Sequence, residues 1–424
     1  MRYLAAATLL AFAMGTAAAS AAETIRIFAN SAHQDAFTGR PGATEGNLQV
    51  AFEKETGIKV VWDTVPWPQM RQNFQRAMAS SSSGAYDVVM VINDWATEDT
   101  LAKLLPLESL SPAIDDKDDI FKPMRDMFTL KGQLVGLPIR SNPQIVHYNK
   151  AIFAEKGIAE PRSFAELMDA ALKVAGKRAD GANVYGFGIK VAADDDMTLV
   201  FKAFGGDVLT KDYRVLINSP QNAATLQKMK QLYDGGGLAP NFATTDTVAT
   251  QNLMREGLLG FVLFGDNYYN RFNDPRSSRV AGQVGFFPIP GAPGAAGPAK
   301  VAFWAVALPA NGPAANRAAA WRFTQYYSSK AAQVQMAING NGPARRSTLE
   351  NERFKADAPY AAASAVALAN AVEIFPAFDG TPQVQAVVAE ETVLAITGRK
   401  PIAEALKTAE TRITAIVAEK RPAR

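Results

Sequence analysis

The sequence contains no cysteine, so it has no disulfide and no thiol for catalysis, for metal binding or for attachment of a lipid anchor. Only two histidines occur, His33 and His147, which leaves little room for a histidine-rich metal site or a Ser-His-Asp triad. Phosphate-loop, dinucleotide-binding, zinc-protease and serine-hydrolase motifs are also missing. From these absences we expect no catalytic residue, no metal and no cofactor.

Acidic residues give no clear metal or catalytic signature either. The run Asp194–Asp196 lacks the glycine and the distal glutamate of an EF-hand loop, so we predict a solvated turn there. Two enzymatic alternatives stay open. The first is that His33, together with Asp35, acts as a general base. The second is glycoside hydrolysis by paired carboxylates, which come from distant positions in a sequence and leave no local pattern.

The charges are nearly balanced, because 44 lysines and arginines face 41 aspartates and glutamates. No dense basic run with interleaved aromatic residues occurs, so nucleic acid is not an expected partner. The chain has 424 residues, which is more than a single core usually supports. We therefore predict two or more lobes.

Long apolar runs are limited to the N-terminus, "MRYLAAATLLAFAMGTAAASAAET". Arg2 precedes an apolar stretch from Leu4 to about Met14, and Ala19-Ser20-Ala21 fits a small-x-small cleavage site. The stretch is shorter than the ~20 apolar residues of a membrane span. We predict a cleaved secretory signal peptide over residues 1–22 and, since no cysteine is available for a lipid tether, a free periplasmic protein.

The rest of the chain alternates between strand and helix patterns. "TIRIFAN", "IKVVWDTV" and "YDVVMVI" read as strands, and helices are predicted from Leu48, from Pro68 and from Asp94 as an N-cap. A capping box at Ser163 to Glu166 predicts the start of a second set of helices and strands, in which "VYGFGI" and "GLLGFVLFG" are the strands. Two β runs around a Gly/Pro/Ala loop at 284–309 predict a hairpin-like excursion. The fold class is α/β.

Several stretches resemble, in the right order, the extracellular solute-binding proteins of ABC importers, in particular the maltose-binding-like group. The resemblance is carried by "YDVVMVINDWATEDTLAKLLPLESL", "GLPIRSNPQIVHYNKAIFAEKGIAEPRSFAELMDAALKV", "FFPIPGAPG", "AAAWRFTQYYSSKAAQ" and "GNGPARRS". It spans nearly the whole mature chain, and "HYNKAIFAEKGI" is its most specific part. The chain departs from the usual pattern at "VAFWAVALP" and "FGDNYYN", which leaves the ligand open.

The resemblance implies a class II periplasmic binding protein fold, with two doubly wound α/β lobes joined by several hinge crossings. The expected ranges are 23–138 plus 284–330 for the first lobe and 139–283 plus 331–424 for the second. The stretch from Pro138 to about Ser141 is expected to be the first crossing, with Arg140 and Asn142 facing the cleft between the lobes. Arg140 in an interdomain salt bridge is the alternative.

Ligand contacts are expected where polar or aromatic side chains follow strand ends or lie near a crossing, because open α/β sheets bind ligands at the carboxyl ends of their strands. Asp94 has a second interpretation as a helix cap, and Arg345 as a surface residue. The candidate ligand-binding residues are His33, Asp35, Trp67, Asp94, Trp95, Arg140, Asn142, Asp207, Asp266, Asn267, Tyr268, Trp304 and Arg345.

The function implied by the resemblance is that of a non-enzymatic, monomeric periplasmic receptor. It would capture a small-molecule solute, a sugar or oligosaccharide, by hinge closure and deliver it to the membrane subunits of an ABC permease. A polyol, glycerol phosphate or other charged solute is the alternative within this class. A periplasmic carbohydrate-active enzyme is the alternative from another class.

Overall fold

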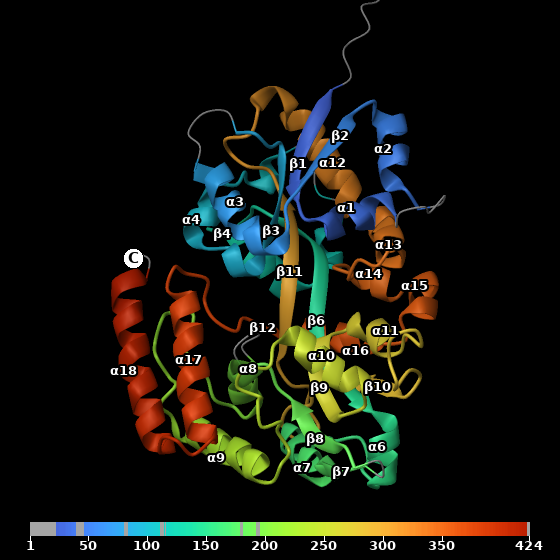
Figure 1. The fold of residues 1–424 in the computed structure, drawn as a ribbon. Coiled ribbons are helices and arrows are strands. Elements are labelled where there is room, and N and C mark those ends of the chain that lie inside the picture. The colour runs from blue at the N-terminus through green and yellow to red at the C-terminus, as the bar shows by residue number, and fades with distance from the viewer. Residues whose placement is uncertain are drawn as a thin grey trace, which may run out of the picture.

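The structure, a computed structural model, describes residues 23–39, 46–79, 84–110, 114, 116–178, 181–191 and 196–421. The predicted signal peptide lies outside these residues. Figure 1 shows two lobes, one above the other, with long strands running from one into the other. No helix among the described residues is long and apolar enough to cross a membrane.

The first lobe is built on parallel strands β1 (Thr24–Ala29), β2 (Lys59–Thr64) and β3 (Val88–Ile92). Strand β11 (Ala299–Ala307) continues this sheet antiparallel to β3. β3 is buried along its whole length, as its unbroken apolar sequence predicts for a strand covered on both faces. Strands β4 (Thr129–Leu130) and β5 (Gln133–Leu134) form a separate small hairpin.

The helical segments that pack into this lobe come from both halves of the chain. They are α1 (Ser31–Thr38), α2 (Leu48–Thr56), α3 (Trp67–Ala79), η1 (Asn93–Trp95), α4 (Glu98–Ala102), η2 (Leu107–Ser109), η3 (Lys117–Asp119), α5 (Lys122–Met127), η4 (Ala314–Asn316), α12 (Arg317–Ser328), α13 (Lys330–Ile338), α14 (Arg346–Leu349), α15 (Glu352–Asp357) and α16 (Ala361–Ala369).

Local sequence explains where several of these helices begin and end. Gly57 ends α2 in the left-handed conformation at φ 73°, which is typical of a C-cap glycine. The predicted cap at Asp94 is wrong, because Asn93–Trp95 forms a short 3-10 turn and Thr97 accepts the hydrogen bond that begins α4. Thr97 is the better cap because it lies immediately before the acidic first turn of that helix.

The second lobe continues the same sheet with β9 (Leu259–Gly265), β8 (Asn183–Gly188) and β7 (Gly176–Lys177). Ser163 accepts a hydrogen bond from the amide of Glu166 and begins α7, as the capping box predicts. The helices of this lobe are α6 (Lys150–Glu155), α7 (Phe164–Val174), α8 (Asp196–Ala203), α9 (Pro220–Asp234), α10 (Thr247–Arg255), α11 (Tyr268–Phe272), α17 (Thr381–Ile396) and α18 (Ile402–Lys420).

Strand β6 (Leu137–Asn149) belongs to both lobes. Its first part, as far as Pro143, pairs with β11, and its second part, from Gln144, pairs with β9. The crossing therefore lies at Pro143 and Gln144 and not at Pro138 to Ser141, because Pro138 still pairs with Ala305 inside the first lobe. Strands β10 (Val284–Phe287) and β11 both pair with β6 and not with each other. The loop between them closes as a hairpin-like turn, as predicted, through an antiparallel bridge between Pro290 and Ala296.

Two main core clusters correspond to the two lobes, and a third, smaller one lies around β9, α10 and α11. The first contains buried side chains from 25–145 and 299–368, and the second from 146–289 and 374–417. These ranges correct the expected boundaries. Segment 331–368 was expected in the second lobe, but α13 to α16 bury residues such as Met336 and Leu368 in the first core.

Candidate ligand-binding cleft

Two cavities flank the crossing strands. The first, which we call the tryptophan cleft, lies beside β11 and is lined by Arg71, Asn93, Asp94, Trp95, Lys300, Val301, Ala302, Val372, Glu373, Ile374, Phe375, Ala377, Thr381, Pro382 and Gln385. The second, the asparagine cavity, lies beside β6 and is lined by Asp266, Asn267, Asn270, Arg271, Ala337, Ile338, Asn339, Gly340, Asn341, Gly342, Pro343, Phe354, Asp357, Ala358 and Tyr360.

The tryptophan cleft has a volume of about 320 Å³ and lies between the lobes. One wall is the end of β3, where Trp95 belongs to the first core, and the opposite wall is the start of α17, preceded by Phe375 of the second core. The short strand β12 (Ala371–Val372), which pairs with β11, leads into this wall.

Polar groups at the end of β3 are held in place by the neighbouring strand. The side-chain oxygen of Asn93 accepts a hydrogen bond of 2.8 Å from the amide of Phe303 on β11. Its Nδ2 donates to Oδ1 of Asp94 at 3.1 Å, so the exposed Asp94 carboxylate is oriented next to the cleft. On the opposite wall, burial raises the pKa of Glu373, whose nearest cation is Lys211 at 3.9 Å.

Aromatic rings pack against one another in tilted and edge-to-face contacts behind the cleft. The Trp95 ring lies 5.5 Å from Phe74 and 5.8 Å from Trp304, and Trp304 in turn lies 4.5 Å from the ring of His33. His33 is fully buried, and burial together with the positive charge of Arg140 holds its pKa well below the usual value. His33 is therefore neutral and supports the tryptophans, with no opening toward a ligand.

The asparagine cavity is larger, at about 550 Å³, and lies at the hinge. Ser364 of α16 donates a 2.6 Å hydrogen bond to Oδ2 of Asp266, and the rings of Tyr269 and Tyr360 lie 5.8 Å apart. These contacts join the second lobe to α16 of the first. Because the lobes are already tied together here, the tryptophan cleft is the better candidate for the gap that closes around a solute, despite its smaller volume.

Asp266 is a buried carboxyl group at the end of β9. Its amide donates to the carbonyl of Pro143 at the crossing, and its Oδ1 accepts from the amide of Asn267. Burial raises its pKa to about 7, which the hydrogen bond from Ser364 and the positive charge of Arg140 only partly oppose. Arg140 is partly exposed, and burial and the nearby Arg271 lower its pKa.

The sequence pattern of the bacterial extracellular solute-binding proteins matches residues 47–362. The chain belongs to this family. The chain is 24% identical over 234 residues to a putative binding protein of Brucella abortus, which covers 54% of this chain and 55% of that protein, so the chain spans about half the length of this relative. It is 21% identical over 376 residues to a probable amino-acid ABC transporter periplasmic-binding protein of Sinorhizobium fredii, covering 85% and 83%.

Solved structures of solute-binding proteins share the fold. The sugar-binding protein MalE of Xanthomonas citri matches with a TM-score of 0.76 at 20% identity, covering 93% of this chain and 98% of that one. An ABC transporter solute-binding protein of Agrobacterium radiobacter, solved in complex with ribitol, matches with a TM-score of 0.74 at 22% identity, over 93% and 98%. At these identities the likeness establishes the two-lobed architecture.

Four predicted ligand residues of this solute-binding protein line a cavity. Asp94 and Trp95 line the tryptophan cleft, and Asp266 and Asn267 line the asparagine cavity. They share one signal, which is a position directly after a strand. The side chain of Trp67, at the start of α3, lies outside the described residues.

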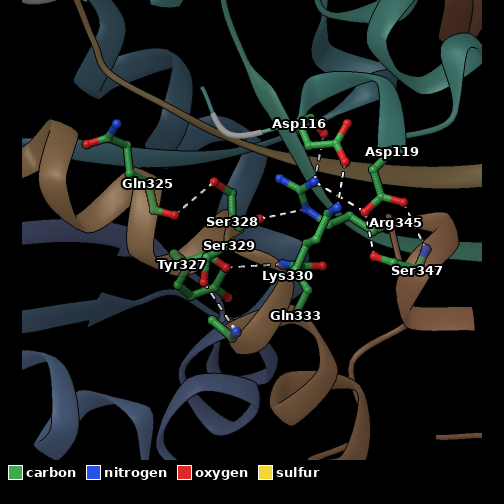
Figure 2. A network of polar contacts seen from close by, with 11 residues as sticks. Asp116, Asp119, Gln325, Tyr327, Ser328, Ser329, Lys330, Gln333, Arg345 and Ser347 are labelled. Atoms are coloured by element: carbon green, nitrogen blue, oxygen red, sulfur yellow. Dashed lines mark hydrogen bonds and ion pairs between the residues drawn. The ribbon is translucent and has the colours of Figure 1, made fainter. Parts of the chain in front are cut away.

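Arg345 was expected in the cleft and is instead a buried structural residue, 1% exposed (Figure 2). Its Nε donates to the carbonyl of Ser328 at 2.8 Å, and its Nη1 donates to the carbonyl of Asp116 at 2.9 Å and to Oδ2 of Asp119 at 3.3 Å. Ser347 donates to the same carboxylate from its amide and its hydroxyl. The alternative prediction, that Arg345 is a surface residue, is also wrong, because the side chain is buried.

Several other predicted residues do not line either cavity. Asp207 forms an ion pair with Lys202 at 2.7 Å and accepts from the amide of Val208, so it fixes a turn. Tyr268 packs on Phe264, with ring centroids 4.5 Å apart. The remaining predicted residues outside the linings are His33 and Trp304, which are buried, Asp35 on the exposed surface of α1, and Arg140 and Asn142 on β6.

The acidic run at 194–196 also differs from expectation at its described residue. Asp196 is fully buried and accepts a 2.9 Å hydrogen bond from Nζ of Lys190, which is buried as well. Asp194 and Asp195 lie outside the described residues. Within the described part of the chain, no three histidine, aspartate or glutamate side chains are grouped as a metal site.

Sequence reasoning missed the residues that the second lobe and α3 contribute to the tryptophan cleft. Four of them are Arg71, Glu373, Phe375 and Gln385. Arg71 lies on the polar face of a helix, where nothing in the pattern distinguishes it from its neighbours. The other three follow β12, a strand of only two residues that periodicity does not reveal.

Proposed function

We propose that the chain is the solute-binding component of an ABC importer, and that it captures a sugar or polyol in the tryptophan cleft for delivery to a membrane permease. The observation that carries this proposal is a cleft between the two cores that combines the rings of Trp95 and Phe375 with the carboxylates of Asp94 and Glu373 and the amide of Gln385. Sugars present hydroxyl edges and flat C–H faces, which suit these groups.

The comparisons support the class of solute. One structural relative is described as a sugar-binding protein, and another contains ribitol. Closure would bring the α17 wall with Glu373 and Gln385 toward Asp94, so that the solute gains contacts from both lobes and stabilises the closed state. Release of unchanged solute to the permease, a monomeric state and a periplasmic location are parts of the same proposal.

An amino acid is the second candidate solute. The Sinorhizobium fredii relative carries that description, and Arg71 forms no hydrogen bond or ion pair with any described residue. Its guanidinium is therefore available to a carboxylate. The two candidates differ in their dependence on Arg71, since a neutral sugar has alternative partners in the cleft.

Isothermal titration calorimetry with ribitol, mannitol, maltose and representative amino acids tests the proposal. Asp94→Asn should weaken binding of a sugar or polyol about tenfold or more, because a charge-assisted hydrogen bond contributes roughly 1.5–3 kcal/mol. Asp234→Asn on the distant helix α9 removes the same charge from an exposed ion pair and is the matched control. Absence of any binding, equal effects of both variants, or chemical conversion of the bound sugar would contradict the proposal.

A further inference from the structure

The asparagine cavity is separate from the tryptophan cleft, because no residue lines both. One wall comes from the second lobe, around α11, and the other from the loop between α13 and α14 in the first lobe. At about 550 Å³ it has the size of a site for a small organic molecule. The proposed solute site leaves this cavity without a role.

One arginine without an ion-pair partner among the described residues lines this cavity. Arg271 lines it and rests on the ring of Tyr268, 4.7 Å from the centroid. Arg140 lies close enough on β6 for the two charges to interact. Neither guanidinium forms a hydrogen bond or ion pair with the described residues; Arg271 is exposed to solvent, and Arg140 is partly buried.

The neighbouring carboxyl groups do not neutralise these arginines directly. Oδ2 of Asp266 accepts from Ser364, and its Oδ1 accepts from the amide of Asn267, so neither oxygen bonds an arginine. Asp357 lines the cavity from its exposed rim. The arrangement leaves the donors of Arg271 available to an anion that enters the cavity from solvent.

Hydrogen-bond acceptors without donors line the same cavity. Asn341 is 3% exposed, and its Nδ2 donates to the carbonyl of Ile139 at 2.8 Å, which fixes the direction of its amide. Its Oδ1 and the Oδ1 of Asn267 have no donor among the described residues. Buried polar atoms of this kind are normally satisfied, by protein, by water or by a ligand. Hydroxyl groups would satisfy them.

We propose that the asparagine cavity binds a hydroxylated organic anion, of the sugar-acid class, with its carboxylate toward Arg271 and its hydroxyl groups toward Asn267 and Asn341. Such a ligand joins Arg271 of the second lobe to Asn341 of the first. Occupancy therefore holds the lobes together at the hinge, and it is a second binding event beyond capture of the transported solute.

A matched set of six-carbon ligands tests the chemical class. Gluconate has a carboxylate and hydroxyl groups, sorbitol has hydroxyl groups without the carboxylate, and hexanoate has the carboxylate without hydroxyl groups. In calorimetric titrations of the full chain at constant ionic strength, gluconate should bind at least about tenfold more tightly than either of the others. Equal affinity for gluconate and sorbitol, or for gluconate and hexanoate, would overturn the proposal.

Variants locate the site. Arg271→Gln should weaken gluconate binding about tenfold or more, whereas Arg276→Gln, whose side chain is 87% exposed in an ion pair with Asp274, should leave it unchanged. Asn270→Asp adds a negative charge at an exposed position of the lining and should also weaken binding, which keeps the test decisive if Arg271→Gln folds poorly. Undiminished binding in a folded Arg271→Gln or Asn270→Asp protein would refute the proposal.

The second site is distinguished from the proposed solute site by Asp94→Asn. This variant should leave gluconate affinity unchanged, whether or not it alters sugar binding. A solute bound in the tryptophan cleft should not displace gluconate. Competition between them, or loss of gluconate binding in Asp94→Asn, would mean that gluconate occupies the tryptophan cleft and would overturn the second site. Failure of every sugar to bind would refute only the proposed solute.

Discussion

Two arginines near the crossing strands have opposite surroundings. Arg345, in the first lobe, has hydrogen bonds from its guanidinium to Ser328, Asp116 and Asp119, and it fixes η3 and the residue before it to the end of α12 (Figure 2). Arg140, at the hinge, has no such partner among the described residues. The comparison separates scaffold from candidate binding surface. An arginine whose hydrogen-bond donors are paired holds the neighbouring segments in one arrangement. An arginine whose donors are unpaired remains available to a ligand.

The largest expected effect comes from removing the satisfied arginine. Arg345→Met should lower the free energy of unfolding by about 3–5 kcal/mol, because it breaks a buried charge pair and leaves backbone carbonyls without donors. Arg140→Met should change it by less than about 1 kcal/mol, or raise it, because a partly buried charge without a counterion is removed. Urea denaturation measures both. Similar losses in the two variants would remove the distinction between the regions.

Asp266 makes the hinge region sensitive to pH. Its pKa is raised to about 7 in the folded protein, above the ordinary value of 3.8, so the folded state binds this proton more tightly than the unfolded state does. The resulting stability is present below about pH 4 and is lost as the pH rises through about 7, on the order of 4 kcal/mol.

Denaturation curves at several pH values test this expectation. Asp266→Asn should flatten the dependence of stability on pH between 4 and 7, because the asparagine does not titrate. Asp357→Asn, at the exposed rim of the same cavity, is the control and should keep the slope. An unchanged slope in Asp266→Asn would show that other groups cause the dependence.

Gly342 tests how closely the loop of the asparagine cavity must approach β6. A Cβ atom added there would lie 1.7 Å from the carbonyl oxygen of Ser141, whose amide donates to Gly342 at 3.1 Å. Gly342→Ala should cost about 2 kcal/mol, because the loop must move away from the strand. Gly136→Ala, whose nearest contacts would be at 3.1 Å, should cost less in the same denaturation assay. The reverse order would show that the approach is not required.

The smallest effect is expected at the edge of the Arg345 network. Lys330 pairs with Asp116 at 2.5 Å, but both side chains are almost half exposed, at 45% and 44%. Lys330→Gln should change the free energy of unfolding by less than about 0.5 kcal/mol, since exposed ion pairs contribute little. A loss comparable to that of Arg345→Met would show that the whole network acts as one unit.

The α/β class and most elements of the fold followed from sequence patterns. Strand β3 and the helix α7 were predicted because an unbroken apolar run and a capping box report local preferences. The crossing was misplaced because Pro138 and Pro143 lie in one strand, and only pairing with β11 and β9 tells them apart. The lobe of α13 to α16 depends on long-range packing, which no local pattern records.

The candidate site was predicted only in part. Residues directly after β3 and β9 line the cavities, because the position of a strand end is visible in the sequence. Arg345 and Arg140 have equivalent local sequence signals, and only the partners brought by distant segments distinguish them. Trp304 was assigned to the cleft as a tryptophan near a crossing, but its neighbours enclose it.

The two lobes interrupt each other along the chain, since the first core needs residues as late as Leu368 and the second as late as Val417. During synthesis, therefore, β1 to β3 emerge long before β11, α12 and α16 are available to cover them. Contacts between segments so far apart form slowly. For a member of an extracellular family, this order of emergence has a use, because a chain that cannot complete either lobe early stays extended enough to be threaded across a membrane before it folds.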